Sequence, residues 1–196
     1  LLASAPVLAD AGKVKRLEDA VVTAMPLGDV FALLAEGHSD WPRRIFDPGL
    51  SAGQSACLAD ELSHEGERRR LRPLATRYVA DNADRIDEDL GVLEAAAPGL
   101  GMMMMAGARR EHTGEVVDEA ALLATLSVAE AEAVVALVYE PRYAPLRRLL
   151  GVGDMFDPDA TQAENDAANE AAGAALAERV MKRAFANCGV PLNNTP

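Results

Sequence analysis

Three segments of the chain carry the capping-box pattern, in which a Ser or Thr is followed three residues later by Gln or Glu. The two side chains of a box satisfy backbone N–H groups that have no partner at the start of a helix. Alanine and leucine, both strong helix formers, supply 38 and 24 of the 196 residues, whereas isoleucine occurs only twice. We therefore predict an all-α fold, a compact bundle of about eight or nine helices with orthogonal or mixed packing. The boxes are Ser51–Gln54, Ser127–Glu130 and Thr161–Glu164.

Prolines, glycines and apolar spacing divide the rest of the sequence. Pro98 and Gly99 are expected to end one long helix, because proline lacks the N–H that a helix interior needs. A length of 196 residues is typical of one domain, which we predict over residues 10–196. The predicted helices cover residues 10–25, 27–35, 51–65, 73–97, 127–140 and 161–187.

Residues 1–9 are small and apolar, and the polar Asp10 follows them. They resemble the end of a secretory signal peptide, with Val7-Leu8-Ala9 preceding the cleavage position. An apolar N-terminal arm is the alternative interpretation. The signal-peptide interpretation predicts a protein of the bacterial periplasm or a secreted one. In the rest of the chain we expect no run of the ~20 apolar residues that a membrane span requires.

The chain has two cysteines, Cys57 and Cys188. In an oxidising compartment such a pair is commonly joined, so we predict a Cys57–Cys188 disulfide. The alternative is two separate buried thiols, which cores tolerate well. Neither cysteine has a second cysteine at the spacing used for redox catalysis or zinc binding.

A longer pattern spans Leu126-Ser127-Val128-Ala129-Glu130 and, further on, Leu137-Val138-Tyr139-Glu140-Pro141. Over about residues 110–150 the chain resembles a bacterial family of exported, all-helical domains of unknown function. That family reads Phe-Thr-x-x-Glu and then Phe-Tyr-x-Ser-Pro-x-Gly on consecutive helices. Ser127, Glu130 and Pro141 match in register, whereas Leu137, Val138, Glu140 and Tyr143 depart from the pattern. The resemblance implies export and helices, and it brings no activity.

Four consecutive methionines occupy positions 102–105. On a helix, consecutive residues fan around most of the circumference, so only Met102 and Met105 share a face. One interpretation is core packing, and another is an adaptable apolar groove for a lipid or a protein partner. A copper site would need thioethers that converge on one ion. We name Met102 and Met105 as the candidate ligand-binding residues and expect no metal.

The charge of the chain argues against nucleic acid as a partner. Its 31 acidic and 19 basic residues give a net charge of −12, which repels phosphate backbones. The one dense basic run, Arg68-Arg69-Arg70-x-Arg72, is either an anion site or a solvated, salt-bridged helix face. The acidic clusters 81–89 and 154–159 lack the glycine and glutamate of a calcium loop, so we expect solvated surface there.

The histidines lack the spacing of a zinc site and are expected on the solvated surface, and no cofactor motif occurs. The leading hypothesis is a non-enzymatic interaction, scaffold or apolar-ligand-binding module, and a homo-oligomer is compatible with it. The alternative is a hydrolase or lyase that works through carboxylates and a histidine in one pocket. The histidines are His38, His64 and His112.

Overall fold

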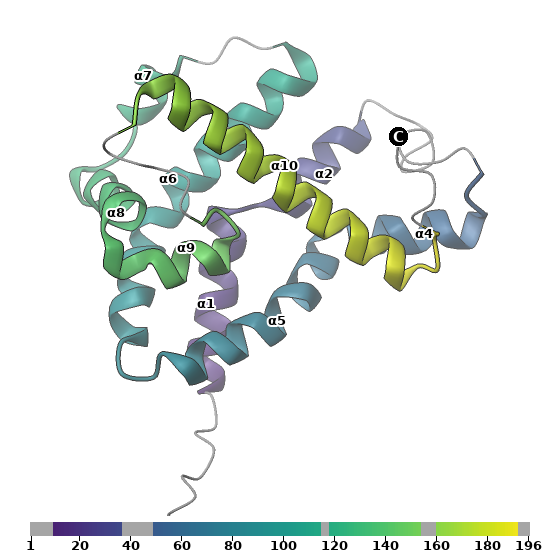
Figure 1. The fold of residues 1–196 in the computed structure, drawn as a ribbon, viewed down its shortest axis with the longest axis horizontal. Helices are drawn as coiled ribbons and strands as arrows, with labels where there is room; N and C mark the ends of the chain where they lie inside the picture. The colour runs from purple at the N-terminus through teal and green to yellow at the C-terminus, as the bar shows by residue number, and fades with distance from the viewer. Residues whose placement is uncertain (1–9, 37–48, 115–117, 154–159, 192–196) are drawn as a thin grey trace, which may run out of the picture.

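The computed structural model describes residues 10–36, 49–114, 118–153 and 160–191 (Figure 1). Within these ranges the protein has nine α-helices, one short 3-10 helix and no strand, which confirms the all-α prediction. The predicted N-terminal segment 1–9 lies outside the described residues. The α-helices are α1 (Ala11–Ala24), α2 (Leu27–Glu36), α4 (Ala52–Glu61), α5 (His64–Asp81), α6 (Ile86–Thr113), α7 (Glu119–Leu123), α8 (Val128–Tyr139), α9 (Ala144–Leu150) and α10 (Gln162–Asn187), and the 3-10 helix η1 is Pro141–Tyr143.

All three capping boxes form as predicted. In the box that begins α4, the Gln54 backbone N–H donates to Ser51 Oγ at 3.2 Å, and the Ser51 N–H donates to Gln54 Oε1 at 3.0 Å. The boxes at the starts of α8 and α10 have the same reciprocal geometry. These local patterns therefore fix where three helices begin.

The predicted helix boundaries at Pro73 and Pro98 are wrong, because the helices continue through these prolines, and the predicted helix 73–97 is divided between α5 and α6. α5 contains Pro73 and α6 contains Pro98. An interior proline costs about 3 kcal/mol through the missing hydrogen bond and the ring clash. Burying one leucine side chain returns about 1.5–3 kcal/mol, and both helices bury apolar residues on each side of the proline. Packing of Leu71, Tyr78 and Leu93 therefore outweighs the local signal.

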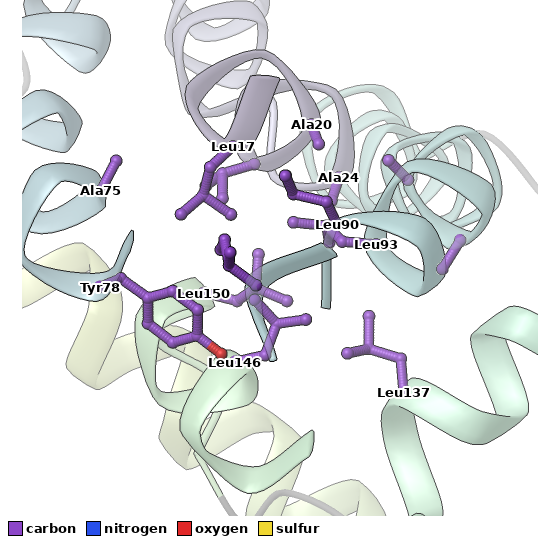
Figure 2. Packing of buried hydrophobic residues seen from close by; sticks show 14 of the residues in the cluster. Leu17, Ala20, Ala24, Ala75, Tyr78, Leu90, Leu93, Leu137, Leu146 and Leu150 are labelled. Atoms are coloured by element: carbon purple, nitrogen blue, oxygen red, sulfur yellow. The ribbon is translucent and has the colours of Figure 1, made fainter. Parts of the chain in front are cut away.

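The larger hydrophobic core lies where α1 crosses α6, with α5, α8 and α9 packed around the crossing. Leu17 and Ala24 of α1 meet Leu90 and Leu93 of α6, and all four are fully buried (Figure 2). Gly101 allows the two helices to approach closely, since a Cβ on it would lie 2.1 Å from the carbonyl oxygen of Thr23. Small residues at this crossing bring the helices together, as the abundance of alanine suggests.

A second cluster of buried residues joins α2, α4 and the C-terminal half of α10. Phe31, Leu58 and Val180 belong to this cluster. The predicted disulfide is present there, with the Cα atoms of Cys57 and Cys188 5.7 Å apart. α10 crosses one face of the molecule diagonally and ends beside α4 (Figure 1).

α6 is the one described helix that is long and apolar enough to cross a membrane, judged by length and composition. Its most apolar window has a mean hydropathy of 1.3, and 39% of that window is buried inside the protein. One such helix is weak evidence for a membrane span, because a core helix passes the same test, and the prediction of no membrane span is compatible with it. In this structure α6 is the central helix of the larger core, where Leu90, Leu93 and Ala96 are fully buried.

Candidate functional site

Two adjacent cavities lie between α10 and the rest of the protein. The first, which we call the apolar cavity, has a volume of about 460 Å³. Ligand pockets in proteins commonly measure about 300–1,000 Å³. Its walls come from α2, α6, α8, α9 and α10, together with Met25 after α1 and Val152 after α9. They are formed by Met25, Leu27, Val30, Phe31, Leu34, Leu100, Met103, Met104, Leu137, Val138, Arg147, Leu150, Val152, Asn169, Ala172, Gly173, Leu176, Ala177 and Val180.

Among the described residues, two with polar side chains line the apolar cavity, Arg147 and Asn169. The guanidinium of Arg147 is hydrogen-bonded to the backbone, since its Nη1 donates to the carbonyl oxygens of Leu137 and Glu140 at 2.9 Å each. Asn169 on α10 has a buried Oδ1 with no hydrogen-bond donor among the described residues. The cavity therefore offers an apolar ligand a surface of aliphatic, aromatic and thioether groups.

The methionine run supplies part of this surface, through Met103 and Met104. Met102 and Met105 are half-buried and are not among the lining residues, so their assignment as ligand contacts stays a prediction. The sulfur of Met102 instead accepts a hydrogen bond from the Thr125 hydroxyl at 3.6 Å. None of the four methionines is fully buried, so core packing accounts for only part of the run.

The second cavity, which we call the arginine cavity, has a volume of about 480 Å³ and opens beside the apolar cavity. Met25, Leu27, Leu150, Leu176 and Val180 line both. Four arginines and one glutamate also line it, and the remaining walls are mainly apolar. These charged residues are Arg70, Arg148, Arg179, Arg183 and Glu67.

Arg70 and Glu67 are the buried charged residues of the arginine cavity, 8% and 4% exposed. Glu67 accepts hydrogen bonds from the backbone N–H groups of Leu27 and Gly28 at 3.3 and 2.8 Å, and so caps the start of α2. Burial raises the pKa of the Glu67 carboxyl, although these two hydrogen bonds and Arg70 act in the opposite direction. Burial also lowers the pKa of the Arg70 guanidinium, and the like charge of Arg183 adds to that effect.

α10 forms one wall of both cavities and is attached mainly near its C-terminal end. Beside the disulfide, Asn187 Nδ2 donates to Glu61 Oε2 at 2.8 Å, and Gln54 Nε2 donates to the Gly189 carbonyl at 3.0 Å. Arg179 Nη2 donates to the Gly151 carbonyl at 3.1 Å. No described residue of α10 before Val180 is fully buried.

The basic run is a salt-bridged helix face, with one exception. Arg68, Arg69 and Arg72 form ion pairs with Asp19, Asp60 and Glu18, at 2.6, 2.6 and 3.0 Å respectively. Arg70 points instead to the interior, where its Nη1 donates to the Glu61 carbonyl oxygen. The signal in the sequence is helical spacing, which places Arg70 on the same face of α5 as Glu67, Leu71 and Leu74.

The acidic cluster at the start of α6 is only partly a solvated face. Asp89 is fully buried and accepts hydrogen bonds from the Tyr78 hydroxyl at 2.8 Å and from the Arg85 guanidinium. Burial and this hydrogen bond to Asp89 raise the pKa of the Tyr78 hydroxyl. Within the described ranges, no group of His, Cys, Asp and Glu side chains could hold a metal ion. The second cluster, 154–159, lies outside the described residues.

The described histidines do not line either cavity. His64 is about half-exposed and its Nε2 lies 2.8 Å from Asp29 Oδ1, while His112 is half-buried near the end of α6. His38 lies outside the described residues. The alternative of a carboxylate-and-histidine enzyme gains no support from these positions and stays a prediction.

Comparison of the chain with family models, curated proteins and solved structures finds no match. The resemblance over residues 110–150 therefore stays a prediction.

Proposed function

We propose that the protein is a non-enzymatic module that binds a small apolar ligand in the cavity beneath α10. The observation that carries this proposal is a space of about 460 Å³ with almost entirely apolar walls. Apolar pockets of this size take up apolar molecules, because transfer of the ligand out of water is favourable. The half-buried Met103 and Met104 support the proposal, since methionine adapts its shape to a ligand.

Binding can be tested with Nile red, an uncharged apolar dye that fluoresces strongly out of water. We expect saturable binding to the wild-type protein. Ala172 lines the apolar cavity, so Ala172→Phe should fill it and weaken binding about tenfold or more. Ala174 lies on the same helix, exposed and outside both cavities, and Ala174→Phe is the matched control. Absence of saturable binding, or equal affinity of both variants, would overturn the proposal.

We also propose that the protein acts outside the cytoplasm, in the bacterial periplasm or beyond. The disulfide supports this location, because disulfides persist in oxidising compartments and are rare in reducing ones. Fractionation of the native host, followed by thiol labelling of the protein, is the test. We expect the protein in the exported fraction with no reactive thiol. A cytoplasmic protein with two free thiols would contradict the assignment.

A second candidate function is docking of a protein partner, including another copy of the chain. Exposed apolar side chains on α8 favour it, since Val128 is 76% and Val135 56% exposed. Sedimentation of the wild-type protein and of Val135→Asp tests self-association. An oligomer that dissociates in the variant would support this candidate, and a monomer in both would exclude self-association through α8.

A further inference from the structure

The two cavities together have the polarity of an amphiphile. They share one wall, formed by Leu150 of α9, Leu176 and Val180 of α10 and the segment that joins α1 to α2. On one side of this wall the lining is aliphatic, aromatic and thioether, and on the other side four guanidinium groups surround the space. A ligand that occupies both cavities therefore needs a hydrocarbon part and an anionic part.

Arg70 is the strongest sign that the arginine cavity is built for an anion. The residue is only 8% exposed, and its Nη2 is buried with no acceptor among the described residues. A buried donor that lacks an acceptor carries a desolvation cost of about 1–3 kcal/mol, and more when the group is charged. An anionic head group in the cavity would supply the missing acceptor.

The other three arginines lie exposed around the same cavity. Neither Arg148 nor Arg183 forms an ion pair with an acidic side chain in the part of the chain that the structure describes. Their guanidinium groups are available for a carboxylate or phosphate, which arginine binds through paired hydrogen bonds. Such a cluster is notable in a chain of net charge −12, where cations are otherwise outnumbered.

Glu67 is the one acidic side chain among the described residues that line the cavity, and it does not cancel this cluster. Both of its carboxylate oxygens accept backbone N–H groups at the start of α2, so Glu67 has a structural partner of its own. Among the described lining residues, four arginines against one glutamate leave a positive charge.

We propose that the ligand is a single-chain anionic amphiphile, with its hydrocarbon tail in the apolar cavity and its carboxylate or phosphate head between Arg70, Arg148 and Arg183. This inference rests on the proposed binding of an apolar ligand and names the chemical class of that ligand. Carboxylate and phosphate heads share the chemistry that arginine recognises. The tail supplies affinity through burial, and the arginines supply selectivity for the anion.

Displacement of bound Nile red by dodecanoate, dodecyl phosphate and neutral dodecanol tests the proposal. We expect either anion to compete about tenfold or more better than dodecanol, because a charge-assisted hydrogen bond contributes that much. The better competitor of the two anions identifies the head group. Arg183→Gln should remove most of the preference, and it is exposed enough to leave the fold intact.

Lys182→Gln is the matched control, because Lys182 neighbours Arg183 on α10, is exposed and lines neither cavity. Equal competition by dodecanol and both anions would overturn the amphiphile and leave apolar binding intact. An equal loss in Arg183→Gln and Lys182→Gln would show general charge attraction and overturn the head-group site. Failure of Nile red itself to bind would overturn the proposed function first.

Discussion

The close crossing of α1 and α6 predicts that Gly101→Ala destabilises the protein. The ideal Cβ position at Gly101 lies 2.1 Å from the carbonyl oxygen of Thr23, a backbone atom that no side-chain rotation can move. Carbon and oxygen normally stay more than about 3 Å apart, so the helices must separate by about 1 Å. Overpacking of this kind costs about 1–3 kcal/mol.

The opposing effect can be measured on the same helix. Alanine is favoured over glycine in a helix interior by about 0.5–1 kcal/mol. Gly91 is exposed and has no atom within 4 Å of its ideal Cβ, so Gly91→Ala should be stabilising by that amount. The same preference acts in both alanine variants, so they should differ by the overpacking cost alone, about 1–3 kcal/mol in the free energy of unfolding.

Urea unfolding followed by far-ultraviolet circular dichroism measures this difference directly. In thermal unfolding we expect a Tm about 2–4 °C lower per kcal/mol for Gly101→Ala, and a rise for Gly91→Ala. If Gly101→Ala were as stable as Gly91→Ala, the reasoning from the helix crossing would be refuted.

Three further variants test the other stabilising contacts. Replacing both Cys57 and Cys188 by serine removes a cross-link between residues 131 positions apart. In urea titrations this should lower the free energy of unfolding by about 5 kcal/mol, because the unfolded chain gains conformational entropy. A loss under about 1 kcal/mol would contradict this entropy argument. Asp89→Asn removes the buried partner of Arg85 and should cost about 3–5 kcal/mol in the same titration, whereas the exposed Asp87→Asn should stay within about 0.5 kcal/mol of wild type. Because burial raises the pKa of Glu67 in the folded protein, its contribution to stability is present below its unfolded pKa of about 4.3 and is lost as the pH rises through the folded pKa. Urea titrations between about pH 4 and 7 should thus show Glu67→Gln gaining stability relative to wild type as the pH rises, and a falling difference would count against the burial argument.

Local signals in the sequence located helix starts well and helix ends poorly. The boxes at Ser51, Ser127 and Thr161 act within one turn, so no distant residue decides them. Pro73 and Pro98 were misleading because burial of side chains from other helices offsets the cost of an interior proline.

The disulfide could be predicted and the cavities could not. Two cysteines allow a single intramolecular pair, so the composition alone named Cys57 and Cys188. The walls of the apolar cavity, by contrast, combine residues such as Phe31, Met103 and Leu176, which only the packing of α10 brings together. The burial of Arg70 could not be predicted either, because the other arginines of the same charged run form ion pairs on the surface.

The disulfide ties the C-terminal end of α10 to α4. The disulfide and the fully buried residues Val180 and Ala184 lie in the C-terminal part of this region, and no described residue of α10 before Val180 is fully buried. If the N-terminal part of α10 detaches, the cross-link at Cys188 still holds the helix beside its cavities at a high effective concentration. Reassembly of the binding site is then an intramolecular step, whose speed does not depend on the concentration of the protein.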